Sequence, residues 1–380
     1  MIYKIGNFAK PVTVCKKTKN FYRGILTNEQ KTVKRVALLL AAVLLLALAG
    51  CGSSGSTKTP EYPTPEKPIT IKWGLSVSTA NQAYINAQVV ADHVKEATNG
   101  AVIVELCPNS QLGNEAAMWE GILSGTIDMA NVSTGTLANT IPEFECFTLP
   151  FVFKNAETFW NVVAQDEFRN KFSELASQSG AVYVGIASMF TRGIATNKPV
   201  TLPEDLAGMK LRIMGGHTYA DMFASWGVGT TTMAFNEVYT GLQQGVIDGL
   251  CVDLGGAVDQ KFFEQCKYFV DTYHGFHCSP GMMRASLWNS LSPEQQQAFS
   301  DGYRLVAEQA VETYYADRAN MEQTAVNDMG VTVTHLTPEQ KQVWIDAVEW
   351  MYKDYQYIDS DLEAWFINYI NENTVESDRF

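Results

Sequence analysis

From residue 69 onward, apolar and polar residues alternate in stretches that are separated by segments with helical spacing. ITIKWGLSVS (69–78) alternates as a half-buried strand does, and NQAYINAQVVADHVKEATNG (81–100) is amphipathic and ends at Asn99-Gly100. AVIVELCP (101–108) predicts another strand, and NEAAMWEGILSG (114–125) predicts a helix that Gly125 closes. This succession of strands and helices predicts an α/β fold.

Further short apolar segments continue the strand pattern, and the later part of the chain is helical. The segments cover residues 127–132, 181–187, 210–214 and 247–252. Ser292-Pro293-Glu294-Gln295 forms a capping box with proline at the first helical position, and a largely uninterrupted helical pattern then runs to about Asp328. Such a helix is about 50 Å long, which is more than one small domain needs. We therefore expect it to span two domains.

A secretory signal precedes the globular part. Residues 31–51 combine a basic segment, an apolar run too short to favour a transmembrane span, and small residues before Cys51. Leu48-Ala49-Gly50-Cys51 looks like a bacterial lipobox, so Cys51 is predicted to be lipidated; an uncleaved membrane anchor is the alternative. We expect a leader and signal peptide at 1–50 and a flexible tether at 51–68. Initiation at Val33 in place of Met1 would give a signal of ordinary length.

The charge of the exported part bears on its partners. Nine of the 28 Lys and Arg and one of the 41 Asp and Glu precede residue 52, which leaves 19 against 40 and a formal charge of −21. Nucleic acid is therefore not an expected partner, and an anionic ligand would need local arginines in a sheltered site. The cysteines of this part show no metal-type spacing, and their disulfide state stays open; they are Cys107, Cys146, Cys251, Cys266 and Cys278.

One arginine stands in an otherwise apolar strand. Residues 209–214, MKLRIM, alternate in the manner of a strand and include Arg212. An arginine in this environment needs an anionic partner, and its planar fork fits a carboxylate bidentately. Arg192 lies twenty residues upstream in a second short segment, from which its guanidinium can reach the same site. A salt bridge between domains is the alternative role for Arg212.

Several motifs occur in a specific order from residue 71 to about residue 369. They are NSQLG (109–113), GTIDM (125–129), LPFVF (149–153), NKP (197–199) with LPEDLAG (202–208), and MAFNEVY (233–239) followed by LQQGVIDG (242–249). In these motifs the chain resembles the extracytoplasmic solute-binding receptors of TRAP (tripartite ATP-independent periplasmic) transporters, the DctP-type family. The resemblance implies a two-lobed, periplasmic-binding-protein-like (type II) fold with the long helix spanning both lobes. Lobe I is then expected at 69–189 plus 278–317, lobe II at 190–277 plus 318–372, and a tail at 373–380.

The resemblance also implies a ligand site in the cleft between the lobes. Arg212 takes the position of the arginine that pairs with the ligand carboxylate, and Arg192 matches a second arginine that reaches the ligand in many members. A charge on a hinge strand is the alternative for Arg192. Phe235 resembles the aromatic residue that packs on the solute, with a core phenylalanine as the alternative.

The chain departs from the family pattern after Asp248-Gly249. Many members carry a ligand-contacting asparagine where this chain has Val252, so that hydrogen bond is lost or comes from elsewhere. Val252 would favour an apolar ligand surface, and Asp253 would accept from a hydroxyl or hold a cation. Further pocket candidates at strand ends are Ser76, Ser78, Asn81, Asn131, Ser133 and Thr134.

The predicted function is that of a non-enzymatic receptor. It would bind a small organic acid and deliver it to the small and large membrane subunits of a TRAP transporter, while anchored by lipid to the outside of the bacterial cell membrane. No cofactor is expected; a cation beside the ligand carboxylate has no supporting motif, and His274-Gly-Phe-His277-Cys278 lacks the cluster of a zinc site. The alternatives are a binding protein of another transporter class, a ligand sensor, or an extracellular enzyme.

Overall fold

The computed structural model describes residues 61–353 and 355–376. One sheet within them, the first sheet, has the strand order β2-β1-β3-β12-β4. β1 is parallel to β2 and β3, whereas β12 is antiparallel to β3 and β4. The strands cover Ile69–Gly74 (β1), Val102–Cys107 (β2), Met129–Asn131 (β3), Ala181–Gly185 (β4) and Gly281–Arg284 (β12). All but β12 fall in segments where the apolar pattern predicts a strand.

The second sheet carries the arginine strand and has the order β13-β10-β6-β9-β7-β8. β7 is parallel to β8 and β9, and β6 is antiparallel to β9 and β10. The strands cover Gly193–Thr196 (β6), Lys210–Ile213 (β7), Gly229–Thr232 (β8), Gly249–Val252 (β9), Tyr268–Asp271 (β10) and Thr332–His335 (β13). The predicted strands at β7 and β9 are confirmed. β8, with the sequence GTTT, has no apolar alternation that would have predicted it.

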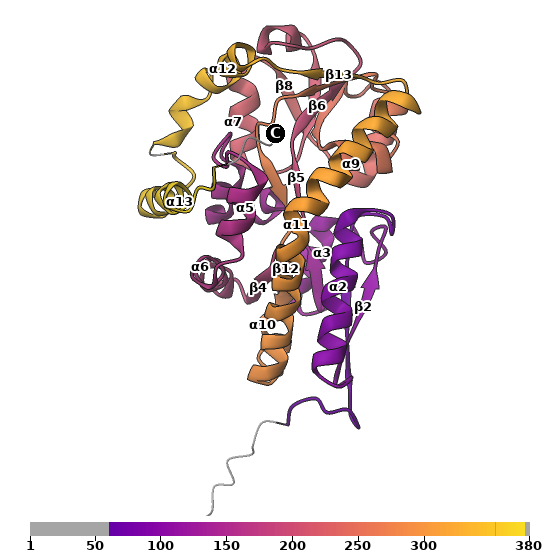
Figure 1. Ribbon diagram of the computed structural model, residues 1–380, viewed down its shortest axis with the longest axis vertical. Coiled ribbons are helices and arrows are strands. Elements are labelled where there is room, and N and C mark those ends of the chain that lie inside the picture. The colour runs from indigo at the N-terminus through magenta and orange to yellow at the C-terminus, as the bar shows by residue number, and fades with distance from the viewer. Residues whose placement is uncertain (1–60, 354, 377–380) are drawn as a thin grey trace, which may run out of the picture. The chain divides into compact units, whose positions relative to one another are not determined.

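The chain passes between the sheets along two paired strands. Along the chain, β5 (Met189–Thr191) follows β4 of the first sheet and precedes β6 of the second. It pairs antiparallel with β11 (Phe276–Cys278). β11 in turn lies between β10 of the second sheet and β12 of the first. Figure 1 shows β5 between the part that holds β4 and β12 and the part that holds β6 and β13. Both passages therefore run side by side.

The helices surround the two sheets. Asn81 and Asn114 cap the predicted helices at 81–100 and 114–125, since each side chain accepts a backbone N–H of the first turn. The helices cover Gln82–Ala97 (α2), Glu115–Ser124 (α3), Thr134–Leu137 (α4), Ala156–Val163 (α5), Asp166–Ser177 (α6), His217–Ser225 (α7), Val238–Gln243 (α8), Leu254–Asp259 (α9), Ala285–Trp288 (α10), Pro293–Asn327 (α11), Pro338–Asp346 (α12) and Ser360–Glu372 (α13). Short 3₁₀ segments include Pro142–Thr148 (η1), Pro203–Leu206 (η2), Phe235–Glu237 (η3), Phe262–Glu264 (η4) and Glu349–Tyr352 (η5).

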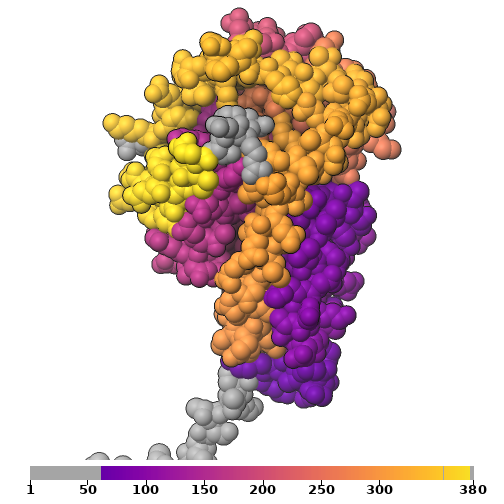
Figure 2. Space-filling view, in the orientation of Figure 1, coloured from indigo at the N-terminus to yellow at the C-terminus, as the bar shows by residue number. Residues whose placement is uncertain are grey.

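The predicted long helix is confirmed as α11, with 35 residues. The Ser292 side chain accepts from the backbone of Gln295, whose side chain accepts from the backbone of Ser292, so the predicted capping box is formed. Toward its start α11 packs on α2, and farther along it packs on α9 and β13. Figure 2 shows α11 (orange) beside α2 (indigo) on the surface of this face. The helix therefore contacts elements of both sheets.

The C-terminal helix α13 lies in the range predicted for lobe II, yet it packs on elements from the range predicted for lobe I. The ring of Phe366 lies 5.5 Å from Phe147 of η1 and 5.9 Å from Phe153, and Trp365 stacks on Phe168 of α6. These rings belong to one hydrophobic cluster that also includes Leu211 of β7. Buried side chains from the ranges predicted for lobe I and for lobe II share this core. The core therefore does not separate the two ranges, and the lobe boundaries stay a prediction.

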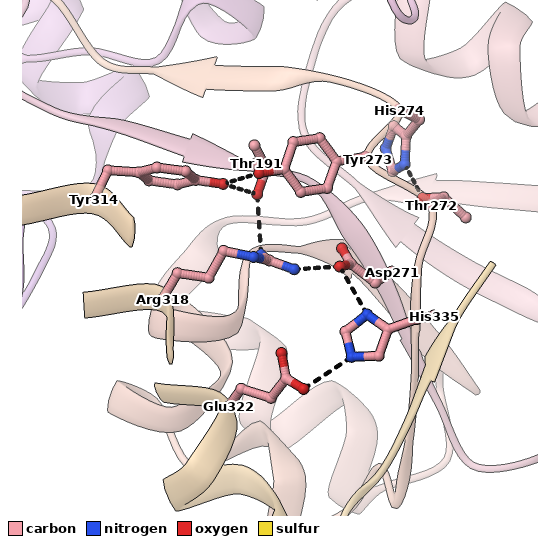
Figure 3. A network of polar contacts seen from close by, with 9 residues as sticks. All are labelled: Thr191, Asp271, Thr272, Tyr273, His274, Tyr314, Arg318, Glu322 and His335. Atoms are coloured by element: carbon pink, nitrogen blue, oxygen red, sulfur yellow. Dashed lines mark hydrogen bonds and ion pairs between the residues drawn. The ribbon is translucent and has the colours of Figure 1, made fainter. Parts of the chain in front are cut away.

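A polar network ties α11 to the second sheet and to β5, as Figure 3 shows. The Arg318 guanidinium pairs with Asp271 of β10 and donates to the Thr191 hydroxyl of β5 at 3.1 Å. The Thr191 and Tyr314 hydroxyls are 2.7 Å apart. His335 lies between two carboxylates, with Nε2 2.8 Å from Glu322 and Nδ1 3.5 Å from Asp271.

We expect His335 to make stability depend on pH above neutrality. Its hydrogen bonds with Asp271 and Glu322 outweigh its burial and raise the pKa of His335 to about 9. Because this pKa lies above the unfolded value of about 6.5, the contribution is complete below pH 6.5 and is lost as pH rises toward 9. The side chain is 58% exposed, so the loss should stay below about 1 kcal/mol.

Thermal unfolding between pH 6.5 and 9 tests this expectation. His335→Gln should flatten the decline in melting temperature, whereas His93→Gln on α2 should leave it as in the wild type. Equal declines in the wild type and His335→Gln would contradict the assignment.

Part of the predicted organisation lies outside the described residues. This holds for the leader and signal peptide at 1–50, the lipidated Cys51, the alternative start at Val33, and residues 377–380 of the tail. At the end of the predicted tether, Thr64 and Lys67 pair across a turn and the Pro63 carbonyl accepts from Gln295 at 2.8 Å. Within residues 61–353 and 355–376, no helix combines the length and the apolar character needed to cross a membrane.

Candidate functional site

Arg212 is a buried cation with an unused hydrogen-bond donor. It lies in β7 between β8 and β9 and is only 3% exposed. Its Nε donates to the Met233 carbonyl at 2.9 Å, while Nη1 finds no acceptor among the described residues. Burial, and then the charge of Arg192, lower the pKa of Arg212 to about 10, so the group is still a cation at neutral pH. A buried charged donor without a partner costs free energy, which an anion would offset.

The ring of Phe235 lies beside this guanidinium. Arg212 Cζ is 5.9 Å from the ring centroid, a distance at which a cation is attracted to an aromatic face. Phe235 begins η3, and its ring packs edge-on against Phe262 with centroids 5.5 Å apart. One side of Phe235 therefore contacts the core and another the arginine.

Arg192 already has a carboxylate partner. It stands between β5 and β6, is 2% exposed, and its backbone N–H donates to Gly275 at 2.8 Å. Nη1 donates to Asp253 at 3.1 Å, and Nη2 lies 2.7 Å from the sulfur of Met214. Asp253 also caps α9, because its Oδ1 accepts from the Gly256 N–H at 2.6 Å. The charge of Arg192 is thus balanced by Asp253, while its buried Nε finds no acceptor among the described residues.

A cavity of about 220 Å³ collects side chains that follow strands of both sheets. Of the residues predicted for the site, six line it: Arg212, Arg192, Phe235, Asp253, Ser76 and Ser133. Asn81 and Asn131 line it as well. Hydroxyl and amide groups make up much of the remaining wall, from Ser110, Asn114, Thr136, Asn139, Ser188, Thr232, Asn236 and Ser279.

Three candidates lie elsewhere. Val252 is fully buried in a hydrophobic cluster with Leu250 and Phe262 and does not line the cavity. Asp253, the next residue, lines it instead. Ser78 donates to Asp259 of α9, and Thr134 is buried outside the lining. Sequence spacing predicted both Val252 and Asp253, at the end of β9, as site residues. Neighbouring side chains of a strand point to opposite faces, so only one of the two faces the cavity.

The polar wall on the side of the first sheet is held by local hydrogen bonds. Asn131 accepts at 2.9 Å from the indole of buried Trp73. Ser133 caps α4, and its hydroxyl lies 2.8 Å from that of Thr136. The buried hydroxyl of Ser76 has no hydrogen-bond partner within the described part of the chain. An oxygen-rich ligand could therefore use the Ser76 hydroxyl without displacing an existing bond.

Sequence reasoning missed Glu115 and considered His277 only for metal. Glu115 lies at the start of α3, directly after the motif at 109–113, and accepts from the Ser133 N–H at 3.2 Å and the Thr136 hydroxyl at 3.3 Å. His277 of β11 also lines the cavity. Burial, followed by the charges of both arginines, holds the pKa of His277 well below its usual range, so the ring is neutral.

The two sides of the cavity come very close at a pair of glycines. Gly135 belongs to α4, after β3 of the first sheet, and Gly215 follows β7 of the second. A Cβ on Gly135 would lie 2.5 Å from the Gly215 carbonyl oxygen, nearer than any real contact. Glycine at 135 therefore permits an approach that a larger residue would block.

A metal centre was considered for the described cysteines and histidines. No group of three His, Cys, Asp or Glu side chains within the described ranges is arranged to hold a metal ion. The cysteines whose disulfide state the spacing left open are all buried free thiols: Cys107, Cys146, Cys251, Cys266 and Cys278.

The chain is similar in sequence to known solute-binding proteins. The family model described as bacterial extracellular solute-binding protein, family 7 (DctP), matches residues 74–358. The C4-dicarboxylate-binding periplasmic protein DctP of Vibrio cholerae is 26% identical over 324 residues, which are 84% of this chain and 94% of that protein. The sialic acid-binding periplasmic protein SiaP of the same organism is 26% identical over 293 residues, 75% of this chain and 88% of that protein.

Solved structures share the fold. A TRAP periplasmic solute binding protein from Sulfurospirillum deleyianum, with bound succinate, is 28% identical with a TM-score of 0.69, over 78% of this chain and 97% of that one. Another from Anaerococcus prevotii, with bound glucuronate, is 24% identical with a TM-score of 0.74, over 80% of this chain and 98% of that one. These likenesses confirm the predicted two-lobed α/β fold.

Proposed function

Because the chain belongs to bacterial extracellular solute-binding protein family 7, we propose that it is the extracytoplasmic receptor of a TRAP-type transporter for a small organic acid. The observation that carries the proposal is the buried Arg212 guanidinium, whose Nη1 has no acceptor among the described residues and which lines the 220 Å³ cavity. A carboxylate accepting from Arg212 would satisfy this donor and neutralise the charge in a site shielded from water. The succinate and glucuronate bound to similar proteins support a carboxylate as the ligand class.

Binding would couple to closure of the two lobes. The cavity wall combines residues that follow strands of both sheets, and β5 and β11 are paired passages between those sheets that can serve as a hinge. A ligand that contacts both walls favours the closed arrangement by its differential affinity for it. The closed form would then deliver the acid to small and large membrane subunits. Retention at the membrane would come from a lipid on Cys51, for which the lipobox-like sequence is the support.

A thermal-shift screen tests the ligand class. Monocarboxylates, dicarboxylates, keto acids, sugar acids and aromatic acids are each added to the purified protein, and a binder raises the melting temperature in proportion to the logarithm of its concentration. We expect at least one carboxylate to do so and to be recovered unchanged after incubation. No stabilisation by any carboxylate would refute the proposed function, and a converted acid would indicate an enzyme.

A further inference from the structure

Four charged side chains line the cavity, and two of them, Arg192 and Asp253, form an ion pair. The four are Glu115, Arg192, Arg212 and Asp253. Asp253 accepts from Arg192 Nη1 at 3.1 Å, and Glu115 accepts from Ser133 and Thr136. Arg192 thus has a carboxylate partner, although its Nε makes no hydrogen bond to the described residues, whereas the described residues offer the charge of Arg212 no carboxylate. Two positive and two negative side chains leave no net positive charge for a second anionic group.

His277 does not change this balance. Its ring lines the same cavity and is fully buried, and the two arginines beside it disfavour a third positive charge. The ring therefore contributes hydrogen-bonding nitrogens but no cation. If one carboxylate of a diacid pairs with Arg212, the other remains in a cavity whose second cation, Arg192, already pairs with Asp253.

We propose that the Arg192–Asp253 pair makes this site selective for hydroxylated monocarboxylates, and that Asp253 is the residue that excludes dicarboxylates. The inference rests on the proposed function, because it assumes that Arg212 binds a carboxylate. A second carboxylate near Asp253 is repelled by its like charge, whereas a neutral hydroxyl there gains an acceptor. The remaining wall suits hydroxyls, since serine, threonine and asparagine side chains both donate and accept.

Asp253 can be neutralised without removing its structural role. Asparagine caps helices as well as aspartate, so Asp253→Asn keeps an acceptor for the Gly256 N–H that begins α9. The change removes the carboxylate that balances the charge of Arg192, so that a second ligand carboxylate can pair with this guanidinium. Asp253→Ser removes the same charge with another capping residue and serves as the second variant. Glu237→Gln, an exposed change in η3, is the matched control for the loss of one negative charge.

Isothermal titration with two pairs of acids tests the inference. D-gluconate and D-glucarate, like L-threonate and L-tartrate, differ only in whether the far end is an alcohol or a carboxylate. The wild type should bind the monoacid of at least one pair about tenfold or more tightly than its diacid. In Asp253→Asn the ratio of the two dissociation constants should fall by about tenfold, and Glu237→Gln should keep the wild-type ratio.

The outcomes separate the inference from the function on which it rests. Tighter binding of a diacid by the wild type, or an unchanged ratio in both Asp253 variants, would overturn the inference while the proposed function stands. No binding of any of the four acids would also overturn it. Failure of the whole carboxylate screen would refute the proposed function itself.

Discussion

Arg212→Met is expected to abolish tight binding of the acid that stabilises the wild type most, while the ligand-free protein stays as stable as before. Truncating one partner of a buried charge pair costs about 2–5 kcal/mol, so the dissociation constant should rise about 30-fold or more. In the ligand-free protein, methionine loses the Nε hydrogen bond to the Met233 carbonyl and the cation contact with Phe235. It also removes the desolvation cost of a buried cation whose Nη1 makes no hydrogen bond to the described residues, so the loss and the gain should nearly cancel. Calorimetric titration and thermal unfolding measure the two effects.

Arg212→Lys separates the charge from the shape of the group. Lysine keeps a cation but lacks the planar fork that donates two parallel hydrogen bonds, so its affinity should resemble that of Arg212→Met. Arg304→Lys, an exposed change on α11, is the control and should bind as the wild type does. Near wild-type affinity in Arg212→Lys would contradict a bidentate contact. A clear loss of ligand-free stability in Arg212→Met would instead indicate a structural role.

The sequence predicted the elements whose pattern is local. The strand that carries Arg212 alternates over residues 209–214, and the capping box at Ser292 marks the start of α11 from four residues. Strands such as β8 and β13 were not predicted because they are four residues long with little apolar alternation; pairing with a neighbour, a nonlocal property, defines them. Sequence spacing also placed Val252 in the site beside Asp253, because spacing does not show which way each side chain points. Of these two residues, only Asp253 lines the cavity.

The ion pair in the site could likewise not be predicted from the sequence. Arg192 and Asp253 are 61 residues apart, and nothing in either segment indicates that the two side chains meet. Both arginines were expected from the sequence to reach the ligand, with Arg212 as the carboxylate anchor, and the sequence did not show that Asp253 pairs with Arg192. The same limit applies to Glu145, which lies 72 residues from the backbone groups that it contacts.

Glu145→Ala is expected to lower the free energy of unfolding by about 3–5 kcal/mol. The fully buried Glu145 carboxylate accepts from the backbone N–H groups of His217 at 2.5 Å and Thr218 at 3.0 Å, which begin α7. The hydroxyls of Thr218 and Thr148 donate to it as well. A carboxylate is favoured at a helix N-terminus, and its removal leaves these donors buried without an acceptor. Denaturant unfolding of wild type and variant measures the loss.

The change should also weaken acid binding, because Glu145 fixes the turn that follows the arginine strand. β7 ends at Ile213, Gly215 lines the cavity, and α7 begins two residues later under the Glu145 carboxylate. Glu145→Gln keeps the volume but turns an amide N–H₂ toward backbone donors, so it should lose part of the stability and part of the affinity. Glu143→Gln, on the same 3₁₀ segment and partly exposed, should stay within about 0.5 kcal/mol of the wild type. Wild-type stability in Glu145→Ala would show that another group accepts the hydrogen bonds of the first N–H groups of α7. Reduced stability with unchanged affinity would show that Glu145 stabilises the fold without affecting the binding site.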